Sequence, residues 1–172
     1  MSMLPLHHVV LSVTDLERSA GFYESLLGYR RTLESAVEGE RYERYLRLPA
    51  GSTGRMMMLQ ADERTVGMIE LIEWSPPLAE TTPPKRVGDP GVTMLALELA
   101  PGETLDAVIE RLAGLGVPLW SEPETVELEA YPPFRTLIVE DPDGILIELI
   151  QLPTRDEVRA YRAALREQEA HA

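Results

Sequence analysis

The sequence predicts an α+β protein made of two tandem βαβββ modules. The segments 68–74 (MIELIEW) and 146–152 (LIELIQL) are nearly the same, and each places one glutamate inside an apolar run typical of a buried strand. A helical pattern follows the first strand of each repeat, and each helical pattern ends at a glycine, Gly28 or Gly116. The shift between the two copies stays at roughly 80 to 90 residues, as expected of a duplicated unit.

The first module, residues 1–75, is expected to open with a strand at residues 7–13, where side chains alternate between two faces. An amphipathic helix follows over 16–27, and a Thr-Asp pair precedes it as a candidate N-cap. The apolar stripe of this helix consists of Leu16, Ala20, Tyr23 and Leu27. Further strands are expected at residues 29–33, 40–48, 55–59 and 67–74.

Residues 76–90 are rich in proline and are expected to form a linker. The pattern then returns in the second module, residues 91–152. Its expected elements are a strand over 92–99, a helix over 104–115, strands over 121–128 and 134–139, a loop at 131–133, a hairpin turn at 141–144 and a strand over 145–152. Residues 153–172 are expected to form a helical extension that docks a stripe of Val158, Tyr161, Ala164 and Leu165.

One glutamate in each repeated strand, Glu70 or Glu148, lies among Ile, Leu and Met side chains. An ionised carboxylate left unpaired in such surroundings costs several kcal/mol or more, so a cation between the two glutamates is expected. His8 has the right phase in the first strand to join them, and its counterpart in the second repeat is Met94. Alternation places all four on the face opposite the helix-packing side chains.

A simpler interpretation of these residues stays open. His8 is then a hydrogen-bonded cavity histidine, and the two glutamates pair with arginines such as Arg44, Arg47 or Arg135.

Two segments resemble a known superfamily. The opening LHHVVLSVTDLERSAGFYESLLGY and the closing VEDPDGILIELIQL are similar to those of vicinal oxygen chelate proteins, and the resemblance covers about residues 4–152. That superfamily includes glyoxalase I, extradiol dioxygenases, methylmalonyl-CoA epimerase, and the fosfomycin and bleomycin resistance proteins. The resemblance implies two βαβββ modules that form a curled mixed sheet around a cavity, but this fold hosts many reactions.

The resemblance also implies a divalent metal held by the first and last strands of each module, at His8, Glu70, Met94 and Glu148. We expect His8, Glu70 and Glu148 to be ligands for Mg²⁺, Mn²⁺, Fe²⁺, Zn²⁺ or Ni²⁺, with Glu148 or Glu70 as a catalytic base. The expected function is a lyase, isomerase or dioxygenase-type enzyme that acts on a small oxygen-chelating substrate. Met94 departs from the pattern because a thioether binds these metals poorly, which makes extradiol cleavage less expected.

The alternative is a metal-free protein of the bleomycin-resistance type that sequesters a cationic small molecule. The net charge of −13 and the methionine at position 94 favour it, whereas the His8, Glu70 and Glu148 set favours the enzyme. Weaker candidates for the substrate pocket are Met94, Tyr45, Trp120, Tyr131 and Arg135. For the aromatic side chains the competing interpretation is ordinary core or interface packing.

The composition limits the remaining classes of function. The negative charge disfavours nucleic-acid binding, and no apolar run approaches the length of a membrane span. The chain has no cysteine, which excludes disulfides and thiolate sites and fits a cytoplasmic location. The expected partners are a small-molecule ligand and a second copy of the chain in a homodimer.

Overall fold

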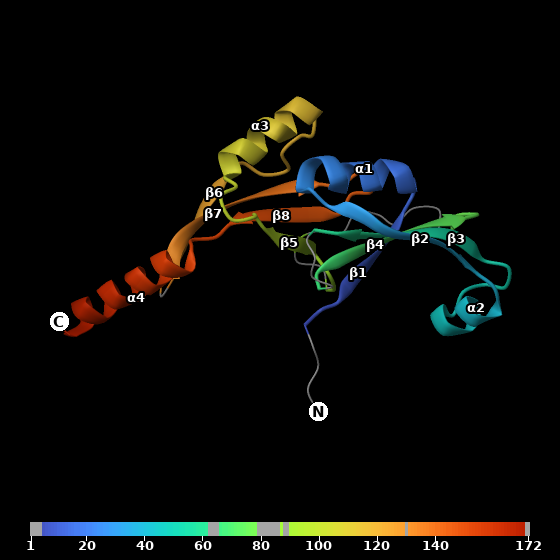
Figure 1. The fold of residues 1–172 in the computed structure, drawn as a ribbon, viewed down its shortest axis with the longest axis horizontal. Helices are drawn as coiled ribbons and strands as arrows, with labels where there is room; N and C mark the ends of the chain where they lie inside the picture. The colour runs from blue at the N-terminus through green and yellow to red at the C-terminus, as the bar shows by residue number, and fades with distance from the viewer. Residues whose placement is uncertain (1–4, 62–65, 79–86, 88–89, 130, 171–172) are drawn as a thin grey trace. The chain divides into compact units, whose positions relative to one another are not determined.

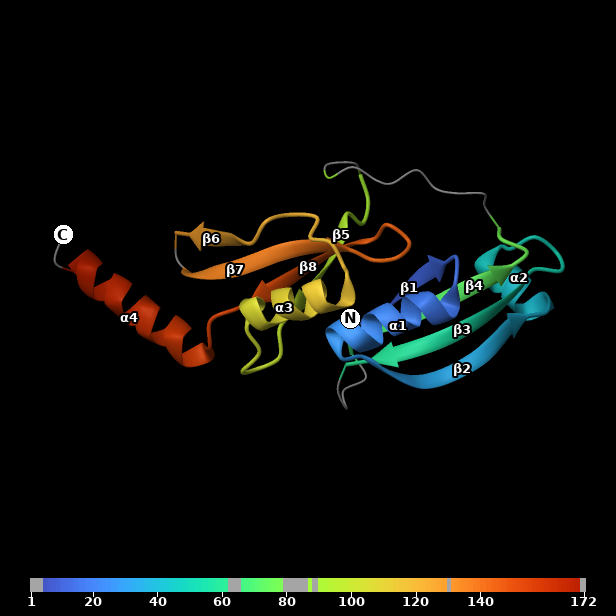
Figure 2. The same ribbon diagram turned by 90° about the horizontal axis from the view of Figure 1, so that it is seen from above.

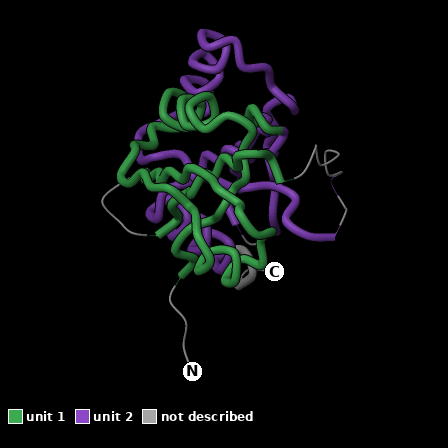
Figure 3. The backbone as a smooth tube through the Cα atoms, turned by 90° about the vertical axis from the view of Figure 1, so that its right-hand side faces the viewer, with its two compact units in different colours: residues 1–84, 141–143 green, residues 85–140, 144–172 purple. Residues whose placement is uncertain are grey.

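The computed structural model describes residues 5–61, 66–78, 87, 90–129 and 131–170, with side chains to residue 167 (Figure 1). Contacts divide the chain into two compact units (Figure 3). Unit 1 comprises Met1–Pro84 together with Asp141–Asp143, and unit 2 comprises Lys85–Glu140 and Gly144–Ala172. Most of the expected linker, residues 76–90, lies outside the described residues.

Unit 1 contains a four-stranded mixed sheet in the order β1-β4-β3-β2, with α1 across one face (Figure 2). Strand β1 is parallel to β4, and the other neighbours are antiparallel. The elements of unit 1 are β1 (His8–Val13), α1 (Leu16–Leu27), β2 (Arg30–Glu38), α2 (Glu40–Leu46), β3 (Thr53–Gln60) and β4 (Met68–Ser75).

Helix α1 forms where the apolar stripe and the capping residues predict it. Asp15 accepts a hydrogen bond from the backbone N–H of Arg18, and Gly28 ends the helix with a positive φ of 69°. The fully buried stripe is Leu16, Ala20, Tyr23 and Leu26, so the last turn packs through Leu26 instead of Leu27. This stripe covers the sheet face formed by Met57, Leu59, Ile69 and Leu71, all of which are buried.

The strand expected at residues 40–48 is wrong, because the structure has helix α2 there. Its sequence, ERYERYL, consists mostly of good helix formers, and none of its residues is buried. A strand needs a neighbour for its backbone groups, whereas a short exposed helix satisfies many of its own. The helix follows Gly39 and ends at Arg47, whose φ of 55° is left-handed.

Unit 2 repeats the arrangement with a four-stranded sheet in the order β5-β8-β7-β6. Its elements are β5 (Met94–Glu98), α3 (Leu105–Leu115), β6 (Glu124–Leu128), β7 (Tyr131–Glu140), β8 (Leu146–Gln151) and α4 (Arg155–Ala170). Helix α3 is capped by Thr104 and buries Leu105, Val108 and Leu112. The loop expected at residues 131–133 is instead the beginning of β7, because this segment pairs with the end of β6.

The C-terminal extension is helical, as expected, and α4 contacts β7. Val158, Tyr161 and Leu165 are half-buried, whereas Ala164 is exposed. Among the described residues, no helix is both long enough and apolar enough to cross a membrane.

The parallel strand pairs β1–β4 and β5–β8 are aligned in the same register, which confirms the α+β class and the duplicated modules. In unit 1, β1 pairs with β4 so that His8 lies beside Met68 and Val10 beside Glu70. In unit 2, β5 pairs with β8 so that Met94 lies beside Leu146, and Glu148 has the place of Glu70. Within the described residues, each module thus contributes one four-stranded mixed sheet.

Candidate functional site

His8 and Glu70 lie on neighbouring strands and are in contact. The Nε2 atom of His8 is 3.2 Å from Oε2 of Glu70, and their side chains are 32% and 15% exposed. Glu73 lies on the opposite face of β4, where its carboxylate accepts a hydrogen bond from the backbone N–H of Leu16 at the start of α1. Alternation therefore places the His8–Glu70 pair on the sheet face that α1 does not cover.

The surroundings of this pair are mostly apolar. Met58 is in register with Glu70 on β3, and Leu33 is in register with Met58 on β2. Val10 and Leu33 are about half exposed, whereas Met58 is half-buried. An apolar surface around one polar pair is the usual composition of a small-molecule site.

In the part of the chain that the structure describes, the carboxylate of Glu70 has the His8 ring as a partner. Arg44, one of the arginines considered as a partner, lies on the exposed helix α2. A carboxylate and an imidazole at this distance can pair with each other or share a cation. The pairing thus agrees with either interpretation of His8, as a cavity histidine or as a metal ligand.

His7 also contacts His8, which strand alternation did not predict. The Nδ1 atoms of the two rings are 2.8 Å apart. His7 precedes the first residue of β1 and is exposed, so its ring is not held on the opposite face of the strand. The adjacent pair of histidines was the only signal in the sequence.

Unit 2 carries the other predicted residues, Glu148 and Met94, on one face of its sheet. The Thr136 hydroxyl donates to Oε1 of Glu148 at 3.0 Å, and it also lies 3.1 Å from the backbone carbonyl of Leu149. Ala96 is in register with Glu148 on β5. Glu148 is therefore held from β7 by a buried hydroxyl, and only a small side chain stands beside it on β5.

The donor atoms of unit 1 suit a divalent cation. Two ligands at right angles, each about 2.1 Å from a metal, are about 3.0 Å apart, close to the observed separation of the His8 and Glu70 atoms. The thioether of Met94 is a poor ligand for hard cations. Within the described residues, no three His, Cys, Asp or Glu side chains gather in a group that could hold a metal. Convergence of Glu148 with His8 and Glu70 stays a prediction.

The weaker pocket candidates are spread over several elements. Tyr45 is 79% exposed on α2, and Trp120 is half exposed before β6. Tyr131 packs edge to face against Phe134, with ring centroids 6.1 Å apart. Arg135 binds both carboxylate oxygens of Asp106, the second residue of α3.

Arg135 therefore points to the α3 side of its sheet. The adjacent residue on β7, Thr136, reaches Glu148 on the other side. In this structure Glu148 thus has Thr136 as its partner, and the guanidinium of Arg135 is engaged elsewhere.

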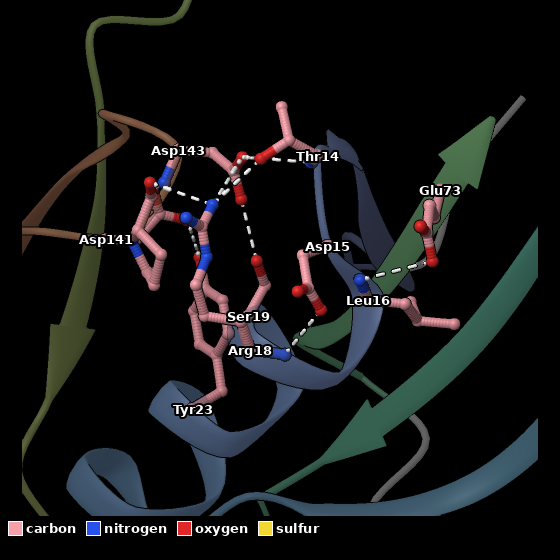
Figure 4. Close-up of polar contacts among 10 residues, drawn as sticks. Thr14, Asp15, Leu16, Arg18, Ser19, Tyr23, Glu73, Asp141 and Asp143 are labelled. Atoms are coloured by element: carbon pink, nitrogen blue, oxygen red, sulfur yellow. Dashed lines mark hydrogen bonds and ion pairs between the residues drawn. The ribbon is translucent and has the colours of Figure 1, made fainter. Parts of the chain in front are cut away.

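The turn between β7 and β8 is anchored in unit 1 (Figure 4). The carboxylate of Asp143 accepts hydrogen bonds from the Thr14 backbone and hydroxyl, from the Ser19 hydroxyl and from the Arg18 guanidinium. Asp141 accepts a hydrogen bond from the buried Tyr23 hydroxyl at 2.8 Å. Through these hydrogen bonds, residues 141–143 form part of unit 1.

These hydrogen bonds and burial change the pKa values of Asp143 and Tyr23. Burial alone would raise the pKa of Asp143, but hydrogen bonds from Thr14 and Ser19 and the charge of Arg18 outweigh it and lower the pKa. Burial first, and then the charge of Asp141, raises the pKa of the Tyr23 phenol well above its usual range. Tyr23 therefore stays a hydrogen-bond donor at every ordinary pH.

The fold and the duplicated register define the class of protein. The family model of the Glyoxalase/Bleomycin resistance protein/Dioxygenase superfamily matches residues 5–149, and the chain belongs to that superfamily. This agrees with the resemblance of its opening and closing segments to vicinal oxygen chelate proteins. Among curated proteins, none matches the chain.

Solved structures of the superfamily share the fold. A glyoxalase family protein from Bacillus cereus has a TM-score of 0.73 at 23% identity, covering 90% of this chain and 97% of the other. A glyoxalase I variant from Zea mays has a TM-score of 0.61 at 18% identity, covering 87% of this chain and 46% of the other. A fosfomycin resistance protein from Listeria monocytogenes has a TM-score of 0.57 at 18% identity, covering 91% and 99%. At such identities the likeness concerns the fold alone.

Proposed function

We propose that this protein is a divalent-metal-dependent enzyme that acts on a small organic molecule with two adjacent oxygen atoms. The observation that carries the proposal is the His8–Glu70 pair, a nitrogen and an oxygen 3.2 Å apart on a sheet face where Val10 and Met58 are the register neighbours of Glu70. Membership of a superfamily that includes glyoxalases and dioxygenases supports it.

In this proposal His8, Glu70 and Glu148 hold the cation. A bound divalent cation would supply Lewis acidity, which stabilises negative charge on a substrate oxygen. The two carboxylates offset the charge of the cation, and the apolar side chains around Glu70 exclude water and strengthen the electrostatic interactions of the site.

Glu148 is the candidate base, and Thr136 is suited to support it. When Glu148 is ionised, the Thr136 hydroxyl can donate to it across the observed 3.0 Å. When Glu148 has taken a proton, the same hydroxyl can accept from it and donate to the Leu149 carbonyl at 3.1 Å. One hydroxyl thus satisfies both protonation states of the base.

The side chains of the proposed ligand set limit the class of reaction that the protein could catalyse. Met94 leaves one imidazole beside two carboxylates, one histidine fewer than the two-histidine, one-carboxylate set of iron oxygenases. Proton transfer to or from the substrate needs no redox chemistry, so a set of one imidazole and two carboxylates would suffice for it. An isomerase, epimerase or lyase reaction is therefore favoured over ring cleavage.

Two measurements on the purified protein test the proposal. Elemental analysis should find a stoichiometric divalent metal. Activity should then be assayed on diketones, hemithioacetals, catechols and acyl-CoA thioesters, each with and without added Mn²⁺. A variant with His8→Ala and Glu70→Ala is the matched control and should lose both metal and turnover. If no class of compound is converted faster with metal, the enzyme proposal fails.

The second candidate function is metal-free capture of a cationic small molecule. Met94 favours it, because a neutral thioether in a ligand position suits an apolar binding surface better than a metal centre. The net charge of −13 would attract such a ligand. Tight binding of a cationic compound, together with no metal and no conversion, would establish this function.

We further propose that the protein acts as a homodimer. Val10 and Leu33 leave apolar surface open on the sheet of unit 1, and pairing of copies would bury such surface. Light scattering at micromolar concentration should give twice the 19.2 kDa mass of the chain. A mass equal to that of one chain would exclude the dimer.

A further inference from the structure

The short helix α2 carries a hollow, the α2 hollow, of about 450 Å³. It is lined by Arg41, Tyr42, Arg44 and Tyr45. No residue of α2 is buried, and the Tyr45 side chain is 79% exposed, so packing of the core does not explain these side chains. The α2 hollow combines two guanidinium groups with two aromatic rings, and its volume is that of an ordinary small-molecule site.

The two arginines of the α2 hollow have no acidic partner among the residues that the structure describes. Elsewhere in unit 1, Arg18, Arg31 and Arg55 each form an ion pair with a carboxylate. The carboxylate of Glu43, also on α2, accepts a hydrogen bond from the backbone N–H of Gly51 at 2.6 Å and is thus engaged with the turn after the helix. In a chain with a net charge of −13, cationic groups without an acidic partner favour an anionic ligand.

Arg41 is held in a position that leaves its hydrogen-bond donors available. Its guanidinium carbon lies over the ring of Tyr42, 4.8 Å from the ring centroid. This cation–π contact depends on the face of the ring and engages none of the N–H groups in a hydrogen bond. A guanidinium oriented in this way can donate two parallel hydrogen bonds to a carboxylate. Arg44 and Tyr45 follow Arg41 by three and four residues, so all three side chains lie on one side of the helix.

The α2 hollow belongs to the side of the unit 1 sheet that α1 does not cover. Figure 1 shows α1 and α2 on opposite sides of this sheet. Helix α2 begins after the end of β2, where Val37 is in register with Gly54 on β3, and Gly54 with Trp74 on β4. Trp74 follows Glu70 by four residues, which span about 13 Å of strand. A ligand at α2 is therefore placed at the end of the face that carries the His8–Glu70 pair, apart from the pair itself.

We propose that the α2 hollow is a binding site for a small aromatic carboxylate. Arg41 and Arg44 pair with the carboxylate, and the exposed ring of Tyr45 stacks on the aromatic part of the ligand. Binding at this site requires no metal, so the inference does not depend on the proposed function. It also assigns this site a ligand of the opposite charge to the cationic molecule of the binding-protein alternative.

A titration of the full-length protein with two probes tests the proposal. Naphthoate carries the carboxylate, whereas naphthylmethanol has the same rings and no charge. The double variant Arg41→Gln, Arg44→Gln removes both guanidinium groups. Its charge-matched control is Arg155→Gln, Arg162→Gln, which changes two exposed arginines of α4 and lowers the net charge equally. Tyr45→Leu removes the aromatic ring but keeps an apolar side chain. All solutions contain EDTA, so that a failure of the proposed metal site cannot affect the result.

Calorimetry should show that the wild type binds naphthoate at least about tenfold more tightly than naphthylmethanol. The variant Arg41→Gln, Arg44→Gln should lose about tenfold or more in affinity for naphthoate, whereas the α4 control should stay within about twofold of the wild type. Tyr45→Leu should weaken both probes by similar factors, because both carry the same rings. Amide NMR shifts caused by naphthoate should be largest in residues 40–47.

Three outcomes would overturn the proposal. The first is equal affinity of the wild type for both probes, or no binding of naphthoate at millimolar concentration. The second is an equal loss of naphthoate affinity in the Arg41→Gln, Arg44→Gln variant and in the α4 control, because a general charge effect would then be responsible. The third is a smaller mass in light scattering for the Arg41→Gln, Arg44→Gln variant alone, because α2 would then contact a second copy of the chain.

Discussion

Met94 occupies in β5 the register position that His8 occupies in β1. His8 lies beside Met68, two residues before Glu70, and Met94 lies beside Leu146, two residues before Glu148. The two units therefore present matching strand pairs that differ in one donor atom, an imidazole nitrogen in one and a thioether sulfur in the other. This difference allows a test of the proposed metal site.

Met94→His should tighten the binding of Mn²⁺ by at least about tenfold, because it replaces a poor ligand by a good one. Isothermal calorimetry of the wild type and the variant measures the change. Met94→Leu is the control and should bind like the wild type, since leucine has no donor atom. Identical affinities in all three proteins would show that position 94 does not face a metal.

Glu148→Gln should abolish metal-dependent turnover, because it removes both a ligand and the candidate base. Circular dichroism should show an unchanged fold, since the amide can still accept from the Thr136 hydroxyl. Under the binding-protein alternative, the same change would weaken capture of a cationic ligand only modestly. Turnover that survives Glu148→Gln would remove this residue from the chemistry.

Thr136→Val should lower the turnover number by about tenfold, whereas Thr136→Ser should stay near the wild type. Valine has the shape of threonine but no hydroxyl, so it separates packing from hydrogen bonding. The readout is the turnover number, with the Michaelis constant measured beside it. A loss in Thr136→Ser as large as that in Thr136→Val would show that the hydroxyl is not what matters.

Asp143→Asn should lower the free energy of unfolding by about 1 to 3 kcal/mol near neutral pH, because several donors converge on this carboxylate. Urea unfolding measures the change. Thr32, whose hydroxyl donates to a backbone carbonyl on the surface, offers a control in Thr32→Ala, which should have little effect.

The stability difference between the wild type and Asp143→Asn should also depend on pH. The pKa of Asp143 is lower in the folded protein than in the unfolded chain. Its stabilisation is therefore fully present above the unfolded pKa of about 3.9 and is lost as pH falls through the folded pKa. The two proteins should approach each other in stability as pH falls below the unfolded pKa of about 3.9, and a constant difference would contradict this account.

Tyr23→Phe should destabilise the protein by about 1 to 3 kcal/mol, because it leaves the buried carboxylate of Asp141 without this donor. In the wild type, the raised pKa of Tyr23 means that the folded state keeps its proton when the unfolded state loses it. Stability should thus fall as pH rises above about 10, and it should fall less steeply in Tyr23→Phe. If the free energy of unfolding of both proteins changed with pH in the same way, Tyr23 would not be the cause of the loss of stability at high pH.

The candidate site was predictable from the sequence in part. His8, Glu70, Met94 and Glu148 stand at equivalent positions in the duplicated strands, and alternation places them on the matching faces. Thr136, which holds Glu148, gave no such signal, because a threonine in a strand is ordinary. The contact between His7 and His8 was not predicted, because side chains alternate between two faces only inside a strand. His7 lies one residue before β1, where this rule does not apply.

By itself, the sequence determined the two modules, the helices α1 and α3 with their capping residues, and the strands that carry the glutamates, because periodicity and caps act over a few residues. Only the tertiary structure decided that Arg135 binds Asp106 and that the turn Asp141–Asp143 belongs to unit 1. These outcomes depend on groups that are distant in the chain. A side chain contacts such a partner only after the strands have paired, so the local sequence does not predict the contact.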